Sequence, residues 1–233
     1  MNIKKIMFAI IMSVLFLTTG CSKAKYFKIT SKNADIALTM DPGNKFGSKS
    51  SIDARAISNL EPISPKKLFA EKNGQQFATI SDIHKSTPGD ISVEKTYGYS
   101  FYIVNKSSDS DVTASVKLTM KNDKGLSDVI RVMTYYEASG VQNIRVYQKE
   151  DKEEVSYADY SIIESRNALK FFDDESVIFD TNKSNENITI SGNEGSNYIR
   201  YTILFWVEEN DPDCNEKVLK NDINFKLEID KVA

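Results

Sequence analysis

Apolar and polar residues alternate along several stretches of the chain, which is the pattern of β-strands with one buried face. Apolar side chains occupy every second position from Val112 to Lys121 and again from Ile223 to Asp230. Arg200 to Val207 is apolar on both faces, which predicts a central strand covered on both sides. The other stretches with strand character are 36–40, 97–104, 130–136, 143–147, 176–179 and 188–190.

Turn-forming residues separate these stretches, and no long segment has helical periodicity. The pattern therefore predicts an all-β fold, an antiparallel β-sandwich of jelly-roll or immunoglobulin-like type. We expect residues 35–233 to form this single domain, with an irregular insertion at about 51–90.

One short helix is predicted before the last strand. Asp211 can be its N-cap, because an aspartate oxygen accepts a backbone N–H that lacks a helical partner. Pro212 fits the first helical position, where no N–H is needed, and Asp213 favours the positive end of the helix dipole.

The first residues have the pattern of a secretory signal peptide. Lys4 and Lys5 precede an uncharged apolar stretch from Ile6 to Leu17, which is shorter than the ~20 residues that span a bilayer. We expect residues 1–20 to be removed on export.

The end of this leader, Leu17-Thr18-Thr19-Gly20-Cys21, resembles the lipobox of bacterial lipoproteins, although Thr18 stands where leucine is usual. The resemblance implies that Cys21 carries a diacylglycerol and that residues 21–34 form a tether. Each buried methylene contributes about 0.8 kcal/mol, so two or three acyl chains would hold the protein firmly on the outer face of the cell membrane. The alternative is an ordinary signal peptide in which Cys21 has no role.

Charge argues against a nucleic-acid partner. The chain has a formal net charge of -3, and removing the two leader lysines changes it to about -5. Acidic and basic residues are interspersed, whereas nucleic-acid binding calls for a basic face.

Cysteine and histidine are scarce. If Cys21 is lipidated, Cys214 is the only other cysteine and no disulfide can form within the chain. We expect Cys214 to be a buried thiol, with a reactive thiol as the alternative. The single histidine, His84, excludes a two-histidine zinc motif within this chain, and its polar surroundings predict a surface position.

The C-terminal half resembles the TasA/camelysin-like family of exported proteins from low-GC Gram-positive bacteria. The resemblance rests on Trp206, Glu208, Asp211, Pro212, Asp213 and Cys214, which follow a Trp-x-Glu-Gly-x-Asp-Pro-Asp-Cys pattern. It extends over roughly residues 91–229, and Glu209 replaces the usual glycine.

This resemblance implies a sandwich domain outside the cell, in a family that includes matrix fibre proteins and metal-dependent peptidases. One histidine offers too few nitrogen ligands for an ordinary zinc site. Glu208, Asp211 and Asp213 could instead bind calcium through oxygen atoms, but helix capping already accounts for both aspartates. We expect no cofactor.

We therefore expect a membrane-anchored structural or binding module that contacts the extracellular matrix or a surface protein, and not an enzyme. The alternatives are an envelope hydrolase that uses carboxylates, and a solute-binding lipoprotein. The second is less consistent with the sequence, because no βαβ alternation is visible.

Overall fold

The computed structural model describes residues 26–43, 49–55, 57, 60–63, 84, 87–91, 95–107, 109–121, 125–150, 169–174, 176–209, 211–214 and 223–232. Of these residues, 59% lie in strands and 6% in helices, which confirms an all-β protein.

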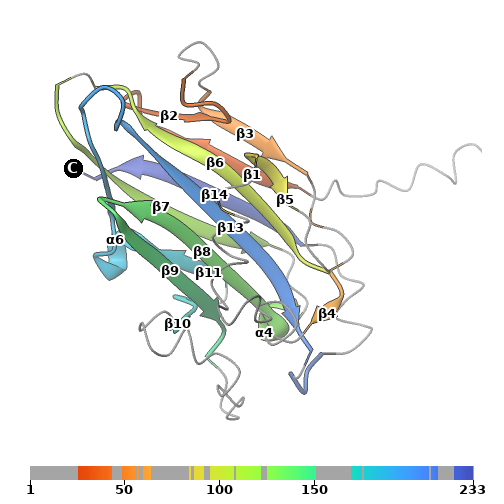
Figure 1. Cartoon of the computed structure of the whole chain (residues 1–233). Coiled ribbons are helices and arrows are strands. Elements are labelled where there is room, and N and C mark those ends of the chain that lie inside the picture. The colour runs from red at the N-terminus through yellow and green to blue at the C-terminus, as the bar shows by residue number, and fades with distance from the viewer. Residues whose placement is uncertain are drawn as a thin grey trace, which may run out of the picture.

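The strands form two sheets (Figure 1). The six-stranded sheet has the order β11 (Val177–Asp180), β7 (Val112–Lys121), β14 (Asn224–Lys231), β1 (Phe27–Ser31) and β3 (Ser51–Ala54), and β12 (Ile188–Ile190) also pairs with β7. The eight-stranded sheet has the order β10 (Leu169–Phe171), β9 (Val141–Gln148), β8 (Ile130–Ala138), β13 (Tyr198–Glu208), β6 (Tyr97–Asn105) and β2 (Ile36–Thr39). In addition, β4 (Pro62–Ile63) pairs with β13, and β5 (Gly89–Ile91) pairs with β6.

All nine strands that the apolar patterns predict are present, because most of the apolar positions in each are buried. The inward residues of β7, from Val112 to Met120, are at most 2% exposed. The turn between β8 and β9 is Ser139-Gly140, and both residues have positive φ, as a two-residue type I′ hairpin requires.

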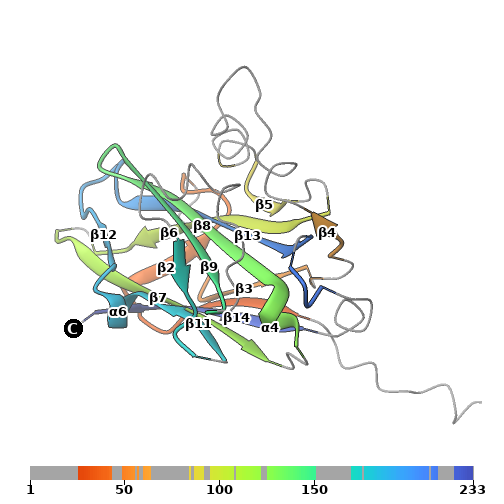
Figure 2. The same ribbon diagram turned by 90° about the horizontal axis from the view of Figure 1, so that it is seen from below.

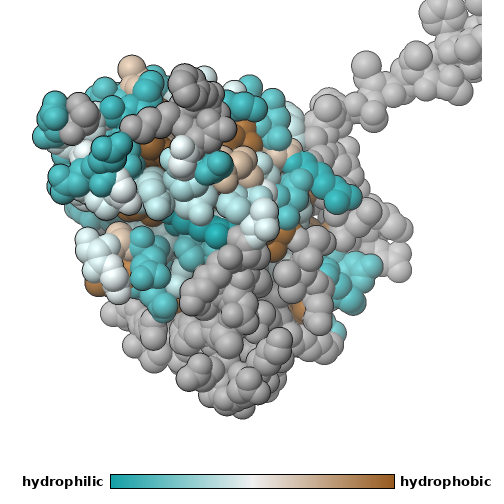
Figure 3. Space-filling model, turned by 45° about the horizontal axis from the view of Figure 1, so that its top comes forward, coloured by the Kyte–Doolittle hydropathy of each residue, from teal (hydrophilic) through white to brown (hydrophobic). Residues whose placement is uncertain are grey.

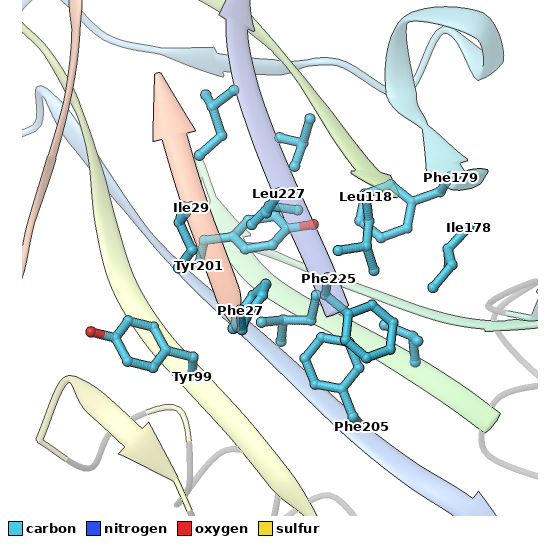
Figure 4. Close-up of a cluster of buried hydrophobic side chains, with 14 of the residues drawn as sticks. Phe27, Ile29, Tyr99, Leu118, Ile178, Phe179, Tyr201, Phe205, Phe225 and Leu227 are labelled. Carbon is cyan, nitrogen blue, oxygen red and sulfur yellow. The ribbon is translucent and has the colours of Figure 1, made fainter. Parts of the chain in front are cut away.

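The two sheets face each other across one apolar core, as Figure 2 shows from below. Phe205 of the eight-stranded sheet contacts Phe27 and Phe225 of the six-stranded sheet, with ring centroids 5.3 and 4.5 Å apart. Figure 4 shows these rings together with aliphatic residues of the six-stranded sheet, including Leu118 and Leu227, and with Tyr99 and Tyr201 of the eight-stranded sheet. Contact between the two inner faces holds the layers together.

The outer face of the eight-stranded sheet is buried as well. Its outward residues include Met133, Val146, Leu204 and Trp206, each at most 1% exposed. The prediction that the strand around 200–207 is covered on both faces is therefore confirmed. In the view of Figure 3, the described surface is mostly hydrophilic, and the brown residues lie in small separate areas.

The sheets are mixed, so the prediction of an antiparallel arrangement is wrong in part. β1 runs parallel to β14, β10 to β9, and β4 to β13. These strands are not joined by tight turns, and only a hairpin connection forces neighbouring strands to run in opposite directions.

The tether is shorter than the predicted 21–34. Phe27 to Ser31 forms β1, inside the six-stranded sheet between β14 and β3, and Phe27 and Ile29 are fully buried. The domain therefore begins no later than Phe27. This five-residue strand has the same alternation as the others but supplies only two apolar residues before the polar Ser31.

The predicted insertion at about 51–90 contributes paired strands where it is described. β3, β4 and β5 fall within it, and each pairs with a longer strand. Most of the remainder, including 64–83, lies outside the described residues. Two short helices, α4 (Leu126–Val129) and α6 (Thr181–Ser184), were not predicted, since one turn is too short to show helical periodicity.

A group of charged residues joins the sheets at one side. Glu186 follows α6, and its carboxylate accepts hydrogen bonds from Arg145 of β9 at 3.0 and 3.1 Å. Lys170 of β10 lies 3.2 Å from the same carboxylate. Beside this group, Tyr147 stacks on Phe179 with ring centroids 4.4 Å apart. These contacts link the β9–β10 side of one sheet to the β11 side of the other.

Replacing Gly98 by alanine should destabilise the domain by about 1–3 kcal/mol through overpacking. An added Cβ would lie 2.2 Å from the Leu204 side chain and 2.9 Å from the Ile203 carbonyl oxygen. Gly43→Ala is the matched control, because its Cβ would meet nothing closer than 3.4 Å. Urea denaturation measures both variants, and equal stabilities would contradict the packing seen at Gly98.

Replacing Glu186 by glutamine should cost about 1–2 kcal/mol near neutral pH. Burial raises the pKa of Glu186, but Arg145 and Lys170 outweigh burial, so the net pKa is lowered. A carboxyl whose pKa is lowered on folding stabilises the fold above its ordinary pKa, and this contribution is lost as the pH falls through the lowered value. The difference between wild type and E186Q should therefore shrink below about pH 5, which denaturation across a pH series measures. A constant difference would exclude this role.

Candidate functional site

The residues of the family-like motif gather where β13 ends and the chain turns toward its last strand. Trp206 and Glu208 point to the outer face of the eight-stranded sheet and are 0% and 1% exposed. Asp211 is 4% exposed, whereas Pro212 and Asp213 are exposed. The motif is thus mostly interior, and only two of its residues face the surface.

At the centre of this region is a buried ion pair between Arg131 of β8 and Asp211. The Nη2 of Arg131 lies 3.0 Å from the Oδ2 of Asp211, and their side chains are 2% and 0% exposed. The Nη1 of Arg131 donates to the carbonyl oxygens of Asp128 and Ile130, each at 3.2 Å. A buried charge requires such partners, because an unpaired ion in the interior is strongly destabilising.

Asp211 also shapes the turn that follows it. Its second oxygen, Oδ1, accepts the backbone N–H of Asp213 at 3.0 Å, and its carbonyl oxygen accepts the N–H of Cys214 at 3.0 Å. The side-chain bond is the one expected of an N-cap. Residues 212–213 form a turn, and the rest of the predicted helix lies outside the described residues.

The contacts of Asp211 show whether the proposed calcium ligands Glu208, Asp211 and Asp213 have oxygen atoms available for a metal ion. Both oxygens of Asp211 are engaged, one with a guanidinium and one with a backbone N–H. Among the described residues, no group of three or more His, Cys, Asp or Glu side chains could hold a metal ion. The arrangement around Asp211 is suited to joining β8 to the turn after β13.

Cys214 is partly buried and packs against the core. Burial raises the pKa of its thiol, and the negative charges of Asp211, Glu208 and Glu209 raise it further. Since the thiolate is the reactive form, these surroundings disfavour a nucleophilic role. The prediction of a buried thiol is correct only in part, because exposure is intermediate.

His84 is buried, so the predicted surface position is wrong. It is 8% exposed, its Nδ1 lies 2.8 Å from the Oγ1 of Thr202, and its ring lies 4.4 Å from that of Tyr135. Thr202 in turn donates to Ser100, which also accepts from the Nε of Arg200. These hydroxyl groups lie on the outer face of the eight-stranded sheet, where they allow a polar ring to pack on a buried surface.

Cys21 and the tether before residue 26 lie outside the described residues. Within the described ranges, no helix is long and apolar enough to span a membrane.

Arg131 is the residue of this site that the sequence did not single out. Its signal is an arginine inside the apolar run Val129-Ile130-Arg131-Val132-Met133. A charge in such a run indicates a buried ion pair or a functional group, but its partner is 80 positions away and becomes evident only in the fold.

Comparison of the chain with protein-family models, with curated proteins and with solved structures finds no match. No relative therefore supplies a role for these residues.

Replacing Asp211 by alanine should destabilise the domain by about 3–5 kcal/mol, because the buried Arg131 would lose its counter-ion. The loss of an N-cap alone costs only about 0.5–2 kcal/mol. Chemical denaturation of wild type and variant should give the same loss of unfolding free energy in the presence of calcium as in the presence of a chelator.

Two further variants test the origin of this loss. Asp213→Ala, at an exposed position of the same turn, should change stability by less than about 0.5 kcal/mol. The double variant R131M/D211L should be more stable than D211A, because it removes both charges. A loss in D211A that appears only with calcium would show that Asp211 is a metal ligand.

Proposed function

We propose that the chain is a bacterial surface lipoprotein, anchored through Cys21 on the outer face of the cell membrane, and that its domain is a structural or binding module. We propose further that the domain is a β-sandwich of jelly-roll or immunoglobulin-like type, related to the TasA/camelysin-like family. Two facing sheets around one core are consistent with a sandwich.

The observation that carries the proposal is the short distance in sequence between Cys21 and the first strand. Phe27 is the first residue of β1 and follows Cys21 by six positions. A segment of that length spans at most about 20 Å when fully extended. A lipid on Cys21 would therefore hold the domain close to the bilayer, with the start of β1 toward it.

The opposite end of the domain would then face outward, and its turns are held rigidly. Asn105, fully buried at the end of β6, donates to the carbonyl oxygens of Ser110, Ile190 and Ser191. The next turn approaches closely, since a Cβ on Gly192 would lie 2.6 Å from the Ser110 carbonyl oxygen. Preorganised turns lose little entropy on binding, which suits contact with a matrix or surface protein.

The interior positions of His84 and Asp211 favour a binding role over a catalytic one. The imidazole is bonded to Thr202, and the carboxylate is paired with Arg131. Both groups therefore stabilise the fold where they stand.

Replacing Cys21 by serine should release the protein from the membrane or leave the leader uncleaved, because serine offers no thiol for the lipid. Labelling with radioactive palmitate followed by membrane fractionation measures this. Cys214→Ser is the matched control and should retain both label and membrane attachment. An unlabelled wild-type protein would disprove the anchor.

A further inference from the structure

The outer faces of the two sheets differ in their accessibility. On the eight-stranded sheet the outward residues Met133, Leu204 and Trp206 are buried. On the six-stranded sheet most outward positions of β1, β7 and β14 are partly buried or exposed, and they carry mostly polar side chains. The six-stranded sheet is therefore the one whose described outer face is open to a partner.

Three lysines lie on this open face at the end where β1 begins. Lys28 of β1 is directly opposite Lys226 of β14. Lys226 is opposite Thr119 of β7, and Lys121 follows two positions later on the same face. Diagonal neighbours of this kind are about 7–8 Å apart at their Cα atoms. We call Lys28, Lys121 and Lys226 the lysine patch.

Tyr26 fixes the tether to the same corner of the sheet. Its backbone N–H donates to the Oδ1 of Asn224 at 2.9 Å, and its carbonyl oxygen accepts the N–H of Phe225. Tyr26 is two positions before Lys28, which places it on the same face, and it is 42% exposed. The chain from Cys21 thus reaches the domain beside the lysine patch.

The patch carries excess positive charge. Lys28 and Lys121 form no ion pair with any residue that the structure describes. Lys226 bonds to Glu228 at 2.9 Å, but Glu228 also pairs with Lys32. Asp53 is opposite Lys28 on the other side of β1. Like charges opposite each other on neighbouring strands destabilise a sheet, and an anionic surface would relieve the repulsion between Lys28 and Lys226.

We propose that the lysine patch, together with Tyr26, rests on the anionic headgroups of the membrane to which Cys21 is attached. This inference rests on the proposed lipid anchor. Phe27 follows Cys21 by six positions, so the start of β1, beside the patch, lies within about 20 Å of the lipid-bearing residue. Tyrosine is a residue type that favours the membrane interface, where its ring is in apolar surroundings and its hydroxyl is hydrated.

The contact gives the domain one orientation on the surface. The protein as a whole is acidic, so an anionic bilayer repels most of it and attracts only a positive region. Each lysine close to such a surface strengthens binding about fivefold. The outer face of the six-stranded sheet would then be toward the lipid near the tether, and the turns around Asn105 would be away from it.

The test uses the lipid-modified chain on vesicles of phosphatidylcholine alone and on vesicles that also contain phosphatidylglycerol. A water-soluble amine-acylating reagent labels accessible lysines, and mass spectrometry measures the rate at each one. On the anionic vesicles, Lys28, Lys121 and Lys226 should react about fivefold more slowly than on the neutral ones. Lys106 and Lys183, at the other end of the domain, should react equally on both.

Equal rates for the patch lysines on both kinds of vesicle would overturn the inference while leaving the lipid anchor intact. A chain that stays in solution, with no acyl mass on its N-terminal peptide, would overturn the anchor and the patch contact together. The two failures are therefore distinguishable in the same experiment.

A charge-matched pair of variants tests the patch without the lipid. In an unlipidated chain that begins at Ser22 and so has neither leader nor lipid, the triple change K28Q/K121Q/K226Q should lower the partition coefficient onto anionic vesicles, measured by sedimentation, about a hundredfold. The control K106Q/K183Q/K231Q removes the same charge elsewhere and should bind as its parent does. Equal behaviour of the two triple variants would contradict the proposal.

Discussion

Burial of β13 on both faces is the constraint on which the rest of the structure depends. On the inner side, Phe205 contacts Phe27 and Phe225 across the core. On the outer side, Leu204 and Trp206 are 1% exposed or less. A strand of this kind must be central, and β13 accordingly has β8 and β6 as neighbours along most of its length. The other long strands of its sheet are arranged around it.

Double burial also decides what the polar groups beside β13 can do. Arg131 and Asp211 lie on the covered side and form an ion pair with each other, and His84 bonds to Thr202 farther along the sheet. An unpaired polar group is strongly destabilising in a low-dielectric interior. The buried histidine, arginine and aspartate, which resemble catalytic groups, therefore have hydrogen-bond or ionic partners within the fold. The more accessible functional surfaces are then the two ends of the domain and the open face of the six-stranded sheet. The parallel pairing of β1 with β14 sets which end of the domain is which. It places the start of β1 at one end of the domain and the C-terminal end of β14 at the other (Figure 1).

The amino-acid sequence by itself determined nine of the strands and much of the core. Strict alternation in β7 and β14 settled which side chains face inward, because the side-chain period of a strand is two. The two-sided apolar run in β13 indicated a central strand for the same reason. Local chemistry also predicted that the Asp211 side chain accepts a backbone N–H just after it, and the structure has that bond from Asp213. These features depend on residues close together in the chain, so they can be predicted from local sequence patterns.

Contacts between distant residues were decided only by the tertiary structure. β1 has two buried apolar residues, too few to separate it from a polar tether, and its strand state follows from partners in β14 nearly 200 positions away. Asp211 pairs with Arg131 across 80 positions, and His84 with Thr202 across 118. The same holds for Lys28 and Lys226, which are unremarkable in sequence and become a charged patch when two strands align. The local sequence pattern specifies which face of a strand is apolar. Which strand lies beside it depends on how distant segments pack together to bury the core.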